Sequence, residues 1–362
     1  MHGIISAHIY IQKIKKICED EGIRKNVITR FLITNIGNDK IIIEDKQISV
    51  TPDELIFTEK ELNKSTKIMK TIKTLKPPII NNYQIELIDR NNYRIIIENK
   101  LEIEVSVGDS KLSVNEMIEL ELLYGALDIS GLGIAVEKSK YMKLMKKAKL
   151  NNWQCHELFA SPFNKIMPSY SSLFPYITVE KKLGAHGHAN NFINELINGS
   201  MKSDGIILAV NPPFDTIIIK EIIELLLKLL KKSEKNFNVE LFIVIPIWDI
   251  ETQKKLYIEE VKNYIKLESG REQETILNDF YEKNKSKQTK KNKWRFLQLW
   301  KNVRDYKDKK NEYDDMINKI KKSKYLVSFN SFIARDYIYR SGNKKMKSIS
   351  DTHEIVMCNY HE

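Results

Sequence analysis

The feature that most constrains the fold is an apolar strand that runs directly into two prolines. Residues 206–210 are all apolar, and the sequence Asn-Pro-Pro-Phe follows at once at 211–214. Because a proline lacks the amide hydrogen and fixes φ, two prolines cannot continue a central strand. Apolar residues at helical spacing then occupy 216–232, with Asp215 in the N-cap position. The segment therefore predicts a buried strand, a rigid loop and a helix.

Short apolar strands alternate with helices on both sides of this segment. Strands are predicted at 153–159 and 239–245, and helices at 139–150 and from 164 to about 173. Apolar strands that alternate with helices are typical of a parallel sheet covered by helices on both faces. We therefore expect an α/β fold with this sheet at its centre.

The N-terminal part of the chain differs from the rest and predicts a separate accessory region. Helical spacing is present at 5–18, and short β-branched runs follow, separated in places by turn-prone pairs. The runs expected to form strands are residues 31–34, 41–43, 83–87, 93–97 and 101–107. We divide the chain into an α+β region at 1–115 and an α/β domain at 116–362, with a Lys-rich insertion at about 250–322.

The loop at 211–214 carries residues suited to one chemistry. In an open α/β sheet, ligands bind at the carboxyl ends of the strands, where this loop begins. The amino nitrogen of adenine is a poor nucleophile because its lone pair is delocalised into the ring. The Asn211 side-chain oxygen and the Pro212 carbonyl can each accept one amino hydrogen and aim the lone pair at a methyl sulfonium. Phe214 offers a flat face for a base drawn out of its stack, so the loop predicts methyl transfer to adenine.

Further motifs surround this loop in a fixed order along the chain. They are His156-Glu157-Leu158-Phe159-Ala160-Ser161-Pro162-Phe163-Asn164, Ser171-Ser172-Leu173-Phe174-Pro175, Gly184-Ala185-His186-Gly187, Phe242-Ile243-Val244-Ile245-Pro246 with Trp248, Tyr339-Arg340-Ser341-Gly342, and residues 352–360. Together with the Asn-Pro-Pro-Phe loop, the set resembles the cap-specific adenosine N6-methyltransferases, the phosphorylated-CTD-interacting-factor group. The resemblance extends from about Gly131 to Gly342 with one large interruption.

The resemblance implies a fold, a cofactor and a substrate. We expect a Rossmann-like core that uses S-adenosylmethionine to methylate the N6 amino group of the adenosine next to an mRNA cap. The residues implied to be catalytic are Asn211, Pro212, Pro213 and Phe214. Those implied to bind the cofactor are Glu157, Phe159, Ala160, Ser161, Pro162, Asn164, Gly184, Gly187 and Asn211. Those implied to bind the substrate are Phe214, Trp248, Arg340, Ser341 and Gly342.

A basic segment inside the insertion adds a second indication of RNA. Residues 283–301 contain seven lysines and one arginine, no acidic residue, and aromatic residues between the basic ones. Basic side chains contact phosphates, and aromatic rings stack on unpaired bases. The residues expected to contact RNA are Lys290, Lys291, Lys293 and Arg295. The alternative is a solvated helical insert, and the net charge of +11 also fits the codon usage of an AT-rich genome.

The chain also departs from the family pattern and lacks some common signals. We find no paired-tryptophan module, so we expect no WW domain and no contact with the phosphorylated polymerase tail. The three cysteines are far apart, and His186 and His188 have no nearby partner ligand, so we expect no disulfide framework and no metal. No apolar run reaches the length of about 18 residues typical of a membrane span. We expect a monomer inside the cell, in the nucleus, the cytoplasm or a viral factory.

Two other functions remain open on the sequence. The same four loop residues also serve DNA amino-methyltransferases that act on adenine or cytosine, which would carry a DNA target-recognition domain. A non-catalytic RNA-binding subunit with a methyltransferase fold is the other alternative, because cofactor binding cannot be seen in sequence. The collinear motifs favour the cap enzyme over both.

Overall fold

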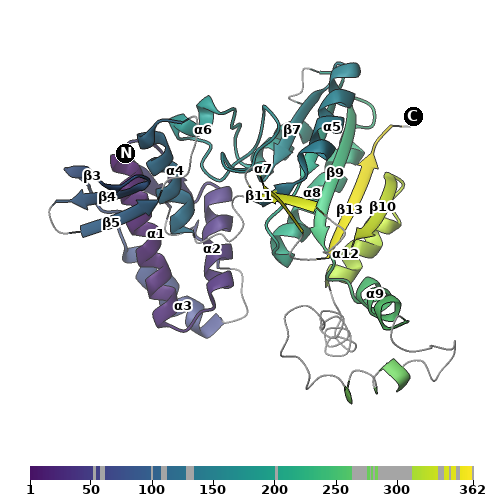
Figure 1. Cartoon of the computed structure of the whole chain (residues 1–362), viewed down its shortest axis with the longest axis horizontal. Helices are drawn as coiled ribbons and strands as arrows, with labels where there is room; N and C mark the ends of the chain where they lie inside the picture. The colour runs from purple at the N-terminus through teal and green to yellow at the C-terminus, as the bar shows by residue number, and fades with distance from the viewer. Residues whose placement is uncertain are drawn as a thin grey trace.

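The structure is a computed structural model in which helices and strands form a mixed α/β fold (Figure 1). It describes residues 1–51, 54–57, 62–98, 101–106, 112–127, 134–199, 203–262, 275–277, 279, 282–283, 312–332, 338–341, 344–347 and 351–360. Among the described helices, none combines the length and the apolar character that a membrane span requires.

The N-terminal part packs helices around two small antiparallel sheets. Its helices are α1 (His2–Asp20), α2 (Lys25–Gly37), α3 (Leu62–Thr74) and α4 (Val114–Ala126), and its strands are β1 (Ile41–Ile43), β2 (Ile48–Val50), β3 (Tyr83–Asp89), β4 (Asn92–Ile97) and β5 (Leu101–Ser106). Strand β1 pairs with β2, and β3, β4 and β5 form a meander. A capping box starts α4, because Ser113 accepts from the Glu116 amide and Glu116 accepts from the Ser113 amide at 3.0 Å.

Helix α2 corrects one sequence-based prediction. Residues 31–34 were expected to form a strand because they are apolar and partly β-branched, but they lie in the middle of α2. The buried side chains Ile28, Phe31 and Leu32 are spaced three or four residues apart, which is the helical period. Burial of this helical stripe outweighs the local preference of β-branched residues for strands.

A five-stranded sheet forms the centre of the second part. Its strands are β7 (Gln154–Leu158), β8 (Gly205–Val210), β9 (Asn238–Pro246), β10 (Leu326–Phe332) and β13 (Thr352–Cys358), in the order β10-β13-β9-β8-β7. Strands β7, β8 and β9 are parallel, as predicted, whereas β13 and β10 are antiparallel to their neighbours. The expectation of an all-parallel sheet is therefore wrong at one edge, because the described residues between β10 and β13 form β11 and β12 rather than a helical crossover of the kind that parallel pairing needs.

Helices cover both faces of this sheet. The helices of this half of the chain are α5 (Lys138–Leu150), α6 (Thr178–Lys182), α7 (Ala189–Ile197), α8 (Thr216–Ser233), α9 (Ile250–Lys262) and α12 (Glu312–Lys321), and those that cover the sheet are α5 on one face and α7, α8 and α12 on the other. Leu208 and Leu241 belong to the core that includes α7, α8 and α12. Ala209 and Phe242, each the next residue along its strand, belong to the core of Tyr141 on α5. Since side chains alternate along a strand, the prediction of helices on both faces is confirmed.

The segment after β7 contradicts the prediction of a helix from 164 to about 173. These residues form turns, and Tyr170 bridges in parallel to Glu157 on one side and to Ala185 on the other. Pro168 stands in the middle of the segment, and a proline removes a helical hydrogen bond and clashes with the preceding turn. The segment instead extends the sheet edge beyond β7.

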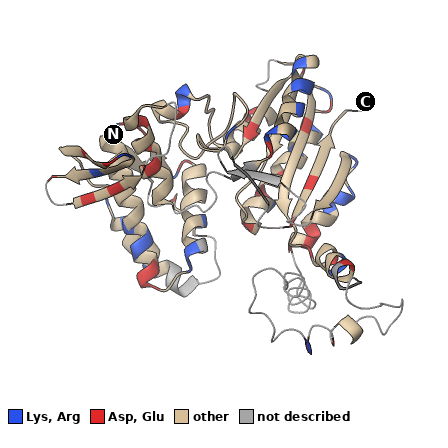
Figure 2. Cartoon of the chain, in the orientation of Figure 1, with Lys and Arg blue, Asp and Glu red and all other residues tan. Residues whose placement is uncertain are grey.

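A small three-stranded sheet joins distant parts of the second half. Strand β11 (Ile338–Ser341) pairs with β12 (Lys344–Lys347) and with β6 (Ile134–Val136), all antiparallel. Strand β6 lies directly before α5, so this sheet brings the residues near the C-terminus beside the start of that helix. Figure 2 shows that lysine and arginine occur both on the N-terminal helices and on the helices around the large sheet.

The N-terminal part and the sheet-containing part share buried contacts. Phe174, Ile177 and Val179 complete the N-terminal core, and Ile33 of α2 packs into the core of α8. Glu180 is fully buried between these parts and accepts hydrogen bonds from Tyr124 of α4 and from Tyr170, both at 2.6 Å. Burial raises the pKa of Glu180 to about 7, and the two tyrosine hydrogen bonds oppose this rise.

Candidate functional site

Three loops meet at the carboxyl edge of the parallel strands. The register aligns Leu158 of β7 with Val210 of β8, and Val210 with Ile243 of β9. The residues that follow these strands are 159–164, 211–214 and 247–249. Because parallel strands end at the same edge, these loops are neighbours in space, as expected for a ligand site in an open α/β sheet.

The loop after β8 is fixed at both ends. All of β8 is buried, which anchors the start of the loop. Asp215 caps α8, since its Oδ1 accepts from the amides of Ile217 and Ile218 at 3.0 and 3.2 Å. The Asp215 amide donates to the Pro213 carbonyl at 2.7 Å, which closes a tight turn. The rigid loop predicted from the two prolines is therefore present.

The Asn211 side-chain oxygen is buried and has no hydrogen-bond partner among the described residues. A buried acceptor left without a donor costs about 1–3 kcal/mol, so such atoms are uncommon in folded proteins. This oxygen lies at the start of the loop, directly after the strand end. The position is therefore ready to accept a hydrogen from a bound ligand.

The last residue of the same loop, Phe214, belongs to an aromatic pair. Phe214 is 38% exposed, and its ring meets that of Trp248 edge to face with centroids 6.3 Å apart. Trp248 also packs on Tyr313 of α12 at 5.6 Å. The structure thus brings together Phe214 and Trp248, two of the predicted substrate contacts, and leaves one ring accessible to a planar ligand.

The loop after β7 begins in a strained conformation. Phe159 has a φ of +61°, a region that bulky residues rarely adopt. The Ala160 amide donates to the Ser171 carbonyl at 3.0 Å, which ties the loop to the neighbouring segment. Strained backbone conformations are frequent at ligand sites, and the conformation of Phe159 makes the chain turn sharply at the edge of the sheet.

Two of the predicted cofactor residues form hydrogen bonds that fix the conformation of this loop. The Asn164 side-chain oxygen accepts from the Ser161 amide at 2.7 Å, so Asn164 closes the turn that contains Pro162. Glu157 is buried, and its carboxylate accepts from the amides of Ile166 and Met167 at 2.8 and 3.2 Å. Their contacts in the described structure shape the loop on which the other cofactor candidates stand.

The two glycines predicted to line the cofactor site are in different surroundings. Both have a positive φ, +93° at Gly184 and +66° at Gly187. A Cβ at Gly184 would lie 2.1 Å from the Pro168 carbonyl oxygen, whereas a Cβ at Gly187 would meet no atom of the described residues within 4 Å. Gly184 is therefore required by packing, and Gly187 borders open space.

We expect Gly184→Ala to destabilise the protein by at least about 2 kcal/mol, because the left-handed conformation alone costs an alanine about 1–2 kcal/mol and the backbone clash adds to it. Gly187→Ala is the matched control and should cost only the conformational part, about 1 kcal/mol. Urea unfolding of the two variants measures the difference. Equal losses would show that the close approach to Pro168 does not constrain Gly184.

The histidines around these glycines have protein partners. Buried His188 lies with Nδ1 3.1 Å from the Ser172 carbonyl and Nε2 3.3 Å from Asp39, and burial lowers its pKa. His156 lies between the hydroxyls of Ser169 and Ser171, and burial together with His186 lowers its pKa to about 3. Among the described residues, no three His, Cys, Asp or Glu side chains gather as metal ligands.

Some predicted substrate contacts fall outside what the structure describes. Lys290, Lys291, Lys293, Arg295 and Gly342 lie outside the described residues. For Arg340 and Ser341 only the backbone of β11 is described, and it pairs with Ala135 and Ile134 of β6. Their roles in substrate binding stay predictions.

Two features of the site were missed by the sequence reasoning. Arg30 of α2 forms an ion pair with Asp215, directly after the Asn-Pro-Pro-Phe loop. His353 of β13 and Asp249 are both fully buried, with Nε2 and Oδ2 2.6 Å apart, directly after Trp248. Each pair joins residues more than a hundred positions apart, so no local sequence signal identifies it.

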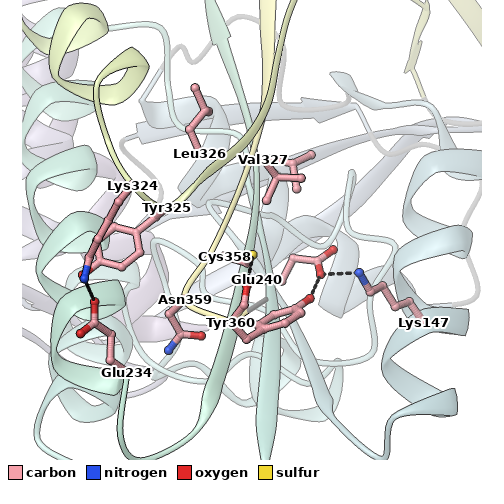
Figure 3. A pocket seen from close by; sticks show the side chains of 11 residues that line it. Lys147, Glu234, Glu240, Lys324, Tyr325, Leu326, Val327, Cys358, Asn359 and Tyr360 are labelled. Carbon is pink, nitrogen blue, oxygen red and sulfur yellow. Dashed lines mark hydrogen bonds and ion pairs between the residues drawn. The ribbon is translucent and has the colours of Figure 1, made fainter. Parts of the chain in front are cut away.

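A groove at the opposite edge of the sheet is separate from these loops. It has a volume of about 630 Å³ and is lined by residues of the α5 end, the first residues of β9 and β10, and the chain after β13. Figure 3 shows that its charged groups pair with each other, Lys147 with Glu240 at 2.8 Å and Lys324 with Glu234 at 2.6 Å. These groups are at the amino ends of the parallel strands, so the groove is not the candidate site.

Comparison with known families gives one match. Residues 124–271 match the family described as the Phosphorylated CTD interacting factor 1 WW domain. This description contradicts the expectation that the chain has no WW domain. That expectation rested on the absence of a paired-tryptophan module, whereas the described part of the matching residues folds as the α/β segment around β7, β8 and β9. A search of curated proteins finds no match. The family match spans all three loops of the site and indicates the phosphorylated CTD interacting factor 1 family.

Proposed function

We propose that this protein is an S-adenosylmethionine-dependent methyltransferase with a Rossmann-like core that acts on the N6 amino group of adenosine in RNA. The observation that carries the proposal is the buried Asn211 oxygen, which has no hydrogen-bond partner among the described residues and lies at the carboxyl edge of the parallel strands. A primary amino group supplies the hydrogen that this oxygen lacks. The family match and the exposed ring of Phe214 support the same assignment.

The residues present fit the cofactor that this reaction needs. Gly187 borders open space, and the strained turn at Phe159 presents the loop of Ala160, Ser161 and Pro162 at the strand edge. We propose that these residues, with Asn211, hold S-adenosylmethionine, while Glu157, Asn164 and Gly184 shape their loops. When bound, the cofactor supplies an electrophilic methyl carbon attached to a sulfonium.

The loop residues have separate roles in the transfer. The Asn211 oxygen and the Pro212 carbonyl each accept one amino hydrogen of adenine and turn the nitrogen lone pair towards the methyl carbon. The Phe214 ring stacks on the base, and Trp248 holds that ring. With the cofactor bound, the adenine nitrogen would take up the methyl group that the sulfonium releases, and one amino proton would pass to water.

The substrate is proposed to be the adenosine next to an mRNA cap. The family whose sequences match is described as a factor that interacts with a phosphorylated CTD. Capped transcripts are made in the nucleus, so we propose that the enzyme meets them there or after export to the cytoplasm. The basic residues of the insertion and of β11 would then contact the RNA chain.

The substrate assignment is tested with the purified protein, tritiated S-adenosylmethionine, and three matched oligonucleotides that begin with adenosine. These are capped RNA, uncapped RNA and single-stranded DNA. We expect label on the capped RNA at a rate at least about 10-fold above the other two. The reason is that contacts with the cap would stabilise the transition state for methyl transfer.

Each other outcome contradicts part of the proposal. Equal label on all three oligonucleotides would make the protein a general amino-methyltransferase. Label on DNA alone would overturn the RNA assignment. No label on any of them, with the cofactor bound in equilibrium dialysis, would leave a non-catalytic RNA-binding subunit.

A further inference from the structure

Helix α2 of the N-terminal part reaches the catalytic loop through Arg30. The Arg30 Nε lies 2.7 Å from the Asp215 Oδ2, and both side chains are mostly buried, 9% and 18% exposed. The contact joins a guanidinium to a carboxylate, so it is an ion pair. Removal from water strengthens such a pair, because the surrounding dielectric is low.

The two oxygens of the Asp215 carboxylate contact different partners. Oδ1 caps α8 by accepting from the amides of Ile217 and Ile218. Oδ2 faces Arg30. An asparagine at this position would keep the cap, because it offers the same side-chain oxygen, and would lose the charge that Arg30 faces. The two roles can therefore be separated by one substitution.

The ion pair is connected directly to the backbone of the catalytic loop. The Asp215 amide donates to the Pro213 carbonyl at 2.7 Å, two residues after Asn211. Ile33, one turn after Arg30 on α2, packs into the core that contains Ile218 and Ile219 of α8. A shift of Asp215 would therefore move Pro213 and the residues before it.

The far end of α2 is anchored on the glycine-loop side of the site. Asp39, which follows the helix with a φ of +57°, accepts from the Tyr176 hydroxyl at 2.6 Å and from Asn191 at 2.8 Å. It also lies 3.3 Å from Nε2 of His188, the residue after Gly187. One rigid helix thus spans from the catalytic loop to the neighbourhood of Gly187.

We infer that Arg30 is a positioning residue that holds the Asn-Pro-Pro-Phe loop in its reactive arrangement, and that α2 is part of the catalytic unit. The inference rests on the proposed methyltransferase function. Arg30 acts through Asp215 and is not among the residues proposed to touch the base or the cofactor. A displaced loop would misplace the Asn211 oxygen, and a misplacement of about 1 Å can cost a factor of about 100 in rate.

The test compares Arg30→Met, Arg30→Lys and Asp215→Asn in the full chain, with Lys25→Met on the same helix as the exposed control. For Arg30→Met and Asp215→Asn we expect kcat to fall about 10- to 100-fold, with KM for S-adenosylmethionine within about 3-fold of wild type. Arg30→Lys should recover most of the rate, because a cation remains. The double variant should be no slower than either single one, since both remove the same contact.

Amide hydrogen exchange of residues 214–219 separates this inference from the proposed function. Faster exchange in Arg30→Met and Asp215→Asn, but not in Lys25→Met, is expected whether or not the protein transfers methyl groups. Unchanged exchange together with an unchanged kcat would overturn the role of Arg30. A wild-type protein without methyl transfer would instead overturn the proposed function, and the exchange data would still decide whether Arg30 holds the loop.

Discussion

Replacing Asn211 with alanine is expected to lower kcat about 100- to 1,000-fold, the range found when one preorganised polar group at a reacting centre is removed. The Asn211 oxygen would accept a hydrogen from the reacting amino group, and alanine offers no acceptor. KM for S-adenosylmethionine should change much less, because the other cofactor residues remain. Steady-state methyl transfer to capped RNA measures both constants.

The same variant has an unusual expected effect on stability. In the part of the chain that the structure describes, nothing hydrogen-bonds the buried Asn211 oxygen, and an unsatisfied buried acceptor costs about 1–3 kcal/mol. Alanine removes that unsatisfied atom, so we expect the free energy of unfolding to stay equal or to rise. Activity and stability would then move in opposite directions, as is typical of residues kept for function.

Asn164→Ala is the matched control for this substitution. The Asn164 oxygen accepts from the Ser161 amide and hydroxyl, so its loss leaves a loop donor unpaired. We expect Asn164→Ala to lose about 1–2 kcal/mol of stability. Two results would contradict the role given to Asn211. One is a kcat within about 3-fold of wild type, and the other is a stability loss as large as that of Asn164→Ala.

Glu180→Gln is expected to stabilise the protein at pH 8 by about 3 kcal/mol and to have little effect at pH 5. The Glu180 side chain is fully buried, and burial raises its pKa from 4.5 to about 7, against the opposing hydrogen bonds from Tyr124 and Tyr170. Each unit of pKa shift corresponds to about 1.4 kcal/mol. A glutamine resembles the neutral acid and does not ionise.

The direction of the pH dependence follows from the raised pKa. Below pH 4.5 the Glu180 carboxyl is neutral in both the folded and the unfolded chain, so its ionisation does not lower the free energy of unfolding. Between pH 4.5 and about 7 the unfolded chain loses the proton while the folded chain keeps it, and stability falls as pH rises. Above about 7 the loss is complete, because the buried carboxylate has then ionised in the folded state as well.

Urea unfolding at pH 5, 6, 7 and 8 measures this dependence. Glu224→Gln, an exposed glutamate of α8, is the control and should follow the wild-type curve. If Glu180→Gln also follows the wild-type curve, the carboxyl does not change its protonation between the two states. Because Glu180 lies between α4 and the segment of Tyr170, the effect reports on the contact between the two parts of the chain.

The local features of the site were predictable because each depends on a short stretch of chain. The strand at 206–210, the proline loop and the helix from Thr216 follow from hydrophobic period and proline chemistry, and all three are present. The side-by-side arrangement of the loops after β7 and β8 also follows, because parallel strands end at one edge. In the same way, helical spacing predicted the helices α1 and α5.

Other local predictions failed where a longer-range effect opposed them. Residues 31–34 have strand-forming side chains, yet the buried stripe of α2 decides their state. The helix expected after Asn164 does not form, because Pro168 interrupts it and Tyr170 completes the sheet edge instead. In both cases burial against other elements outweighs the preference of a few residues.

The sequence by itself predicted which residues are suited to the chemistry, and it determined on which edge of the sheet they stand. Only the tertiary structure decided what surrounds them among the described residues: an Asn211 oxygen without a hydrogen-bond partner, an ion pair from Arg30 to Asp215, and a Gly184 that is tightly packed where Gly187 is not. The physical reason is distance along the chain. Periodicity and turn chemistry act over a few residues, whereas burial, ion pairing and close backbone approach join residues that only the folded chain brings together.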